Sequence, residues 1–73
     1  MRSTLDVLRL LHSLGYRYAR LSGFPSYEDG CTVVLFHVPH GQGRRAFTAF
    51  ISEQEDRPPR VEVEPGFVVQ QGR

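Results

Sequence analysis

The sequence predicts an α+β domain in which one N-terminal helix packs on an antiparallel sheet of four to five short strands. Three observations lead to this fold class. Leucines recur at helical spacing over residues 3–14, two runs of β-branched and aromatic residues flank a glycine-containing turn between residues 31 and 52, and apolar and charged residues alternate afterwards. With 73 residues, the chain is expected to form one domain, 1–73, of marginal stability.

Residues 3–14 carry a helix start, an apolar face and a helix end. Ser3 or Thr4 is suited to cap the first turn with a side-chain oxygen, and Asp6 lies where the helix dipole favours an anion. Gly15 is expected to end the helix in a left-handed conformation. The predicted apolar face consists of Leu5, Leu8, Leu11 and Leu14, widened by Val7 and Leu10.

Five segments are typical of strands: residues 16–21, 31–38, 45–52, 60–64 and 67–70. The segment 31–38 is apolar on both faces, with Val33 and Leu35 on one face and Val34 and Phe36 on the other, which predicts a central strand covered on both sides. Residues 22–30 are expected to form a loop that ends in an Asp29-Gly30 turn, and Pro65-Gly66 suits a type II turn.

Composition narrows the classes of function. The net charge of +1 disfavours a dedicated nucleic-acid binder, although residues 1–45 contain six arginines and only three carboxylates. No apolar run approaches the roughly 20 residues that span a bilayer, and the N-terminus lacks the pattern of a signal peptide, so we expect no membrane association and a cytoplasmic location. Cys31 is the only cysteine, which excludes an intrachain disulfide and suggests a small core residue.

The polar residues form no pattern that is specific for catalysis or metal binding. His37 and His40, with Cys31 and His12 elsewhere, do not match the spacing of zinc ligands. The serines occupy cap and turn positions, and no helix follows the Gly41-x-Gly43 pair to make a phosphate site. The carboxylates cluster in a proline-bounded loop, at Glu53, Glu55 and Asp56. We therefore expect no enzyme activity, no cofactor and no metal.

The strongest candidate for a function is a contact surface at the tip of the central hairpin. Its predicted residues are His40, Gln42, Arg44 and Arg45, with Arg17 and Arg20 extending a basic face, and with the aromatic residues Phe24 and Tyr27 as a second contact region. The alternative is a polar hairpin end that only keeps the domain soluble. A short sheet also leaves edges that can pair, so a homodimer is a further possibility.

These features predict a small non-enzymatic module that binds another protein as a regulator or inhibitor. Small stand-alone proteins of this kind, including those of phages and mobile elements, are often regulators or inhibitors. The alternative function is binding of RNA or DNA through an arginine patch made of Arg17, Arg20, Arg44 and Arg45.

A family resemblance covers part of the chain. Residues 7–23 hold an amphipathic helix that ends in Gly15-Tyr16 and a strand with Arg20, and the segments 36–40 and 44–48 continue the pattern. In these features the chain resembles HicA-like toxin domains and the related double-stranded RNA-binding domains. The resemblance implies an α-β-β-β core. It does not imply ribonuclease activity, because Thr32 stands where the catalytic histidine is expected and the closing lysine-rich helix is absent.

Overall fold

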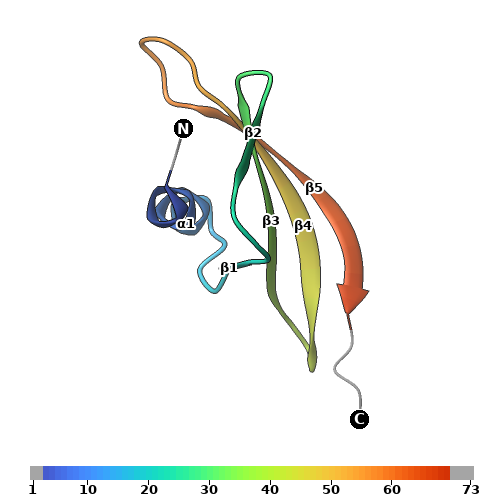
Figure 1. Ribbon diagram of the computed structural model, residues 1–73. Helices are drawn as coiled ribbons and strands as arrows, with labels where there is room; N and C mark the ends of the chain where they lie inside the picture. Colours follow the sequence, from blue (N-terminus) through green and yellow to red (C-terminus); the bar gives the residue numbers. More distant parts are fainter. Residues whose placement is uncertain (1–2, 70–73) are drawn as a thin grey trace.

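The computed structural model describes the backbone of residues 3–69 and the side chains of residues 3–66. These residues form one helix and five antiparallel strands (Figure 1): α1 (Thr4–Ser13), β1 (Arg20–Leu21), β2 (Ser26–Glu28), β3 (Cys31–His40), β4 (Gly43–Ser52) and β5 (Arg60–Val69). The strand order is β1-β3-β4-β5, and β2 pairs with the same edge of β3 as β1. The predicted α+β class is confirmed.

Local hydrogen bonds set both ends of α1. The Ser3 side chain caps the helix by accepting a hydrogen bond from the Asp6 N–H at 3.1 Å. At the other end Gly15 has a φ of +106°, and the N–H groups of Gly15 and Tyr16 donate to the carbonyls of His12 and Leu11. These two bonds make a Schellman motif, which ends the helix and turns the chain toward the sheet.

The face that α1 buries differs from the predicted leucine face. Val7 and Leu11 are fully buried, whereas Leu5 is 56% and Leu14 49% exposed. A repeat of three residues drifts by about 60° around a helix at each step, because an α-helix turns about 100° per residue. The leucines therefore cannot all face the sheet: Leu5 lies on the side opposite Val7, and Leu14 follows the last helical residue.

Tight turns connect β2 to β3 and β3 to β4. Asp29 and Gly30 both have positive φ, 53° and 74°, between the paired residues Glu28 and Cys31, as a type I′ turn requires. Gly41, with a φ of 59°, begins the two-residue turn of the central hairpin. The Asp29-Gly30 turn thus closes a hairpin, so the segment predicted as a loop at 22–30 contains the strand β2.

The first predicted strand, at residues 16–21, is shortened to β1. The Tyr16 N–H donates to the Leu11 carbonyl in the helix-ending motif, and the Ala19 N–H donates to the Tyr16 carbonyl at 3.3 Å. Backbone groups that close the helix and the turn after it cannot also join the sheet. Only Arg20 and Leu21 pair with β3, opposite His37 and Phe36.

The strand β5 is continuous where the sequence predicts two strands, 60–64 and 67–70, and a turn. Pro65-Gly66 lies inside β5, at a register shift relative to β4 between Arg45 and Phe47, and residue 70 lies outside the described part of the chain. A side chain at Gly66 would place its Cβ 3.1 Å from the Ala46 carbonyl oxygen. The Pro-Gly pair therefore marks a β-bulge with close backbone contact.

The sheet has two unlike faces. On the helix face, Thr32, Val34 and Phe36 of β3 are exposed by 1% or less, whereas Leu35, which points the other way, is 56% exposed. The prediction that β3 is covered on both sides is therefore wrong. In Figure 1 α1 lies against one side of the sheet, and the described residues contain no second helix to cover the other side. We call that other side the open face; its central residues are Val33, Leu35, Thr48 and Phe50.

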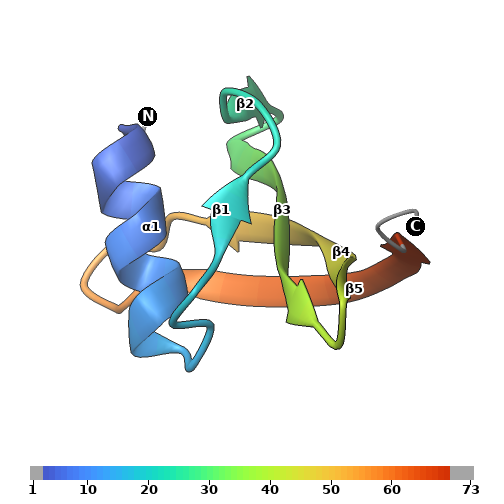
Figure 2. The same ribbon diagram turned by 90° about the horizontal axis from the view of Figure 1, so that it is seen from below.

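The core lies between α1 and the helix face. Val7 and Leu11 pack with Val34, Phe36, Ala49, Ile51 and Ala19. α1 is about 15 Å long and β3 about 33 Å, so the helix covers only part of the hairpin. The Tyr16 ring extends this cover, since it lies 5.2 Å from the Phe36 ring and 5.6 Å from the Phe47 ring. Figure 2 shows α1 and β1 together at one side of the twisted sheet.

Candidate functional site

The structure divides the residues predicted at the hairpin tip. His40 and Gln42 are exposed at the turn. Arg44 and Arg45 are neighbours on β4, so their side chains point to opposite faces of the sheet and do not project together. Both arginines are half-buried. The predicted tip surface therefore separates into one group on the helix side and one group on the open face.

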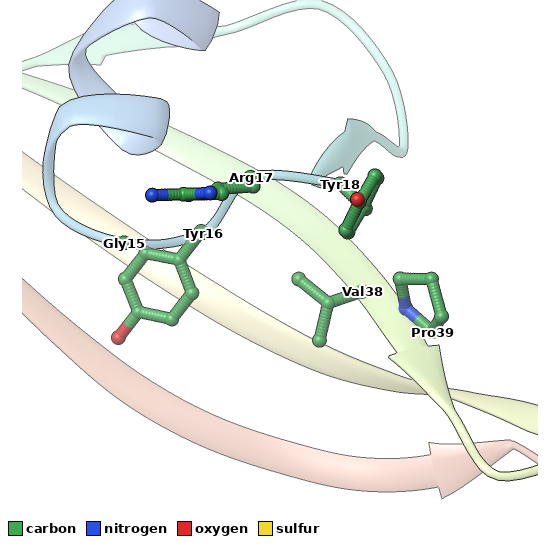
Figure 3. Close-up of a pocket in the computed structure, with 6 residues that line it drawn as sticks. All are labelled: Gly15, Tyr16, Arg17, Tyr18, Val38 and Pro39. Carbon is green, nitrogen blue, oxygen red and sulfur yellow. The ribbon is translucent and has the colours of Figure 1, made fainter.

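A shallow hollow lies beside the end of α1, and Arg17 is the predicted site residue in its lining (Figure 3). The hollow has a volume of about 270 Å³, and its lining consists of Gly15, Tyr16, Arg17, Tyr18, Val38 and Pro39. Arg45 faces the same side, with its guanidinium 5.6 Å from the centre of the Phe47 ring. Its Nε is buried and has no hydrogen-bond partner among the described residues. Arg45 thus serves mainly to cover Phe47.

The open-face group is a basic corner made of Arg20, His37 and Arg44. Arg20 of β1 is directly opposite His37 of β3 in the sheet register, and Arg44 Nη1 lies 3.1 Å from His37 Nδ1. Because a guanidinium can only donate, Nδ1 accepts this hydrogen bond and the imidazole is neutral, with its proton on Nε2. Burial lowers the pKa of His37 below the ordinary value of 6.5, and the charges of Arg44 and then Arg20 lower it further.

Next to the basic corner lies an apolar strip of Val33, Leu35 and Phe50. Val33 and Phe50 are paired across β3 and β4 and are half-buried. Phe24, in the loop between β1 and β2, is 94% exposed and lines a hollow of about 160 Å³ together with Val33 and Leu35. The predicted aromatic pair is separated, because Tyr27 is opposite Thr32 and so lies on the helix side.

The remaining margin of the open face is charged. Arg60, Glu62 and Glu64 of β5 lie opposite Ser52, Phe50 and Thr48, and Arg60 Nη2 is 2.9 Å from Glu62 Oε2. This pair is largely exposed, so it adds little to stability. Arg60 offsets the charge of Glu62 within the pair, so the net negative charge of these three residues corresponds to that of Glu64.

Cys31 and the histidines take separate places. Cys31 is half-buried on the open face, where Ser52 Oγ lies 3.9 Å from its Sγ. His37 and His40 are three residues apart on one strand, so they point to opposite faces. No three His, Cys, Asp or Glu side chains gather closely enough to hold a metal ion within the part of the chain that the structure describes.

The sequence predicts that Val33 and Leu35 are covered, yet they belong to the open face. A signal was present: the chain has two apolar strand faces and only one helix with an apolar side. A single short helix cannot cover both faces of a sheet whose strands are twice its length. Comparing the number of helices that can cover the sheet with the number of apolar strand faces would have identified one face as exposed.

No protein-family model, no curated protein and no solved structure matches this chain. The resemblance to HicA-like domains stays a prediction. No helix among the described residues has the length and apolar character needed to cross a membrane.

Proposed function

We propose that this protein is a non-enzymatic binding module that acts on another protein through its open face. One observation carries the proposal: Leu35, in a strand at the middle of the sheet, is 56% exposed. Large apolar residues in central strands are normally covered, and a contiguous exposed apolar patch on a small domain typically marks a contact surface. The strip of Val33, Leu35 and Phe50, with Phe24 beside it, is such a patch.

The edges of the sheet are less suited to binding than its open face. On one side β1 and β2 are only two and three residues long. On the other side β5 carries Pro65, a bulge and the charged residues Arg60, Glu62 and Glu64. Short strands, prolines, bulges and charges are the means by which proteins protect sheet edges from pairing. This favours a partner that packs on the face over a partner that extends the sheet.

The residues around the strip also suit a protein interface. Arginine and aromatic side chains dominate the energetics of such interfaces, and Arg20, Arg44 and Phe24 surround the apolar centre. Three hollows on the surface of the described residues have volumes of about 270, 250 and 160 Å³. These are below the roughly 300–1,000 Å³ of small-molecule sites, and they fit single side chains of a partner better than a substrate. A stoichiometric role as a regulator or inhibitor follows from this mode of action.

The test compares two equally exposed leucines. Leu35 and Leu5 are both 56% exposed, one on the open face and one on α1. We expect Leu35→Glu to abolish capture of a partner from lysate by the immobilised protein, and Leu5→Glu to retain it, with circular dichroism confirming that both variants fold. Capture that is equal for both variants, or absent from the wild-type protein, contradicts the proposal.

The second candidate is nucleic-acid binding. The observation that favours it is the pair Arg20 and Arg44 on one face with the exposed ring of Phe24, since arginines hold phosphates and aromatic rings stack on bases. Fluorescence anisotropy with single-stranded RNA and duplex DNA tests it. Binding that weakens steeply between about 50 and 200 mM salt supports this function, and no binding at low salt excludes it.

A further inference from the structure

We propose that the open face recognises a partner segment in which a carboxylate side chain stands next to a large apolar side chain. The carboxylate lies between Arg20 and Arg44, and the apolar side chain packs on Leu35 and Phe24. This inference rests on the proposed protein-binding function and adds the chemistry of the partner to it.

The two arginines are arranged to share one anion. Arg20 and Arg44 belong to β1 and β4, on either side of β3, and both are next to His37. Adjacent strands are about 4.8 Å apart, and Arg44 is opposite Pro39, two residues along β3 from His37, so the Cα atoms of the two arginines are separated by roughly 12 Å. Two arginine side chains bridge this distance when a carboxylate lies between them, and guanidinium–carboxylate hydrogen bonds are among the strongest in proteins.

Among the described residues, the positive charge of this corner is held in place without a carboxylate that cancels it. A carboxylate next to Arg44 would neutralise the charge of its guanidinium, but the guanidinium contacts the Nδ1 of His37, a neutral acceptor. The charges that act on His37 are those of Arg44 and Arg20, both positive. The carboxylates Glu62 and Glu64 lie opposite Phe50 and Thr48, at other positions of the sheet. An anion from a partner therefore supplies the missing opposite charge.

The apolar half of the site is at a matching distance. Leu35 lies two residues before His37 on the same face of β3, which corresponds to about 7 Å along a strand. The hollow between Leu35, Val33 and Phe24 has a volume of about 160 Å³, which suits one side chain. Side chains two positions apart in an extended segment have the same spacing of about 7 Å. The geometry therefore fits an acidic residue and an apolar residue two positions apart.

The charge of the whole face favours a protein segment over a nucleic acid. Glu64 borders the apolar strip beside the Arg60–Glu62 pair, whose two charges offset each other, so a polyanion that extends across the face meets the negative charge of Glu64 there. A single carboxylate at the corner avoids it. The chain's net charge of +1 adds no general attraction for phosphates.

A displayed library of random short peptides provides the probe. We expect the wild-type protein to select peptides with Asp or Glu close to Leu, Ile, Met or Phe. The variant Arg20→Glu/Arg44→Glu is expected to select Lys or Arg at the acidic position, because the charge of the corner is reversed. Its matched control is Arg9→Glu/Arg57→Glu, which changes the net charge equally at two exposed arginines away from the open face and should keep the acidic preference.

A second variant covers a failure of the first to fold. Arg20→Gln/Arg44→Gln adds no negative charge, and we expect it to bind a selected acidic peptide at least about tenfold more weakly than the wild-type protein, measured by anisotropy. Selected peptides without acidic residues, whose binding is lost in Leu35→Glu, overturn this inference and leave the proposed function standing. An acidic preference that survives Arg20→Glu/Arg44→Glu also overturns it. If no peptide is selected, this inference and the proposed function both fail.

Discussion

The two faces of the same strands differ more than their sequences do. Phe36 and Leu35 are neighbours on β3, and both are large and apolar, yet Phe36 is completely buried and Leu35 is 56% exposed. On the helix face, apolar side chains pack against Val7, Leu11 and Tyr16. On the open face, similar side chains meet solvent and a corner of two arginines. The comparison teaches that one pattern of residues forms the core on one side of a strand and stays exposed to solvent on the other.

The polar residues of the two faces also differ in burial and in hydrogen bonding. Thr32 on the helix face is buried, and its hydroxyl has no hydrogen-bond partner among the described residues. His37 on the open face is only half-buried and accepts a hydrogen bond from Arg44. A buried polar atom without a partner costs free energy, whereas an exposed one is solvated. The open face therefore tolerates polar chemistry that the helix face does not.

The largest effect on the free energy of unfolding is expected from truncating Phe36, compared with truncating its neighbour Leu35 on the other face. Phe36→Ala should lower the free energy of unfolding by about 3–5 kcal/mol, because it leaves a cavity in the core. Leu35→Ala should change it by about 0.5 kcal/mol or less, as at other surface positions. Urea denaturation measures both. If Phe36→Ala does not fold, Phe36→Leu gives a measurable value, and similar losses at positions 35 and 36 would contradict the difference between the faces.

A smaller effect, of opposite sign, is expected at Thr32. Thr32→Val replaces the buried hydroxyl with a methyl group of similar shape, so the free energy of unfolding should rise by about 1 kcal/mol. Thr48→Val on the open face is the control and should change it by less than about 0.5 kcal/mol, since the Thr48 side chain is half-exposed. Thermal unfolding followed by circular dichroism distinguishes them. A loss of stability in Thr32→Val would mean that its hydroxyl has a partner.

The smallest effect concerns the pH dependence of the open face. The pKa of His37 is lowered in the folded protein by burial, Arg44 and Arg20. Below the ordinary pKa of 6.5, the unfolded chain binds a proton that the folded protein does not, so the stability contributed by His37 is present above this pH and is lost as the pH falls through it. Unfolding by urea on both sides of this pH measures the slope.

Two variants distinguish the contribution of His37 to the pH dependence of stability from the contributions of other groups. His37→Asn keeps a hydrogen-bond acceptor for Arg44 and removes the titrating group, so stability should depend less on pH. His40→Asn, at the exposed hairpin tip, should leave the wild-type slope unchanged. A slope that is the same in His37→Asn and in the wild-type protein would show that His37 is not responsible.

Much of the fold could be predicted because its signals are local. Ser3 and Gly15 mark the helix ends through bonds to residues three or fewer positions away, and Asp29-Gly30 and Gly41 mark turns through their positive φ angles. The error at Pro65-Gly66 arose because a long-range contact competes with a local preference. Pro65-Gly66 suits a turn by itself, but pairing with β4 holds it in a bulged strand.

The candidate site was predicted in its residue types and not in its arrangement. Arg20, Arg44 and Phe24 belong to the open face, while Arg17, Arg45 and Tyr27 lie on the helix side. Period-two alternation alone separates Arg44 from Arg45 once both are placed in a strand. It cannot pair Arg20 with His37, because that neighbour relation comes from the register between β1 and β3.

By itself, the sequence determined the helix, the central hairpin and the sets of residues that share a strand face in that hairpin, since caps, turns and alternation depend on neighbours along the chain. Only the tertiary structure decided which of two apolar faces became the core. Both Val33-Leu35 and Val34-Phe36 are suited to burial, and the choice depends on the side on which the single helix packs. The Schellman motif at Gly15 and the turn that leads to β1 set that side, and the face left open became the candidate binding surface.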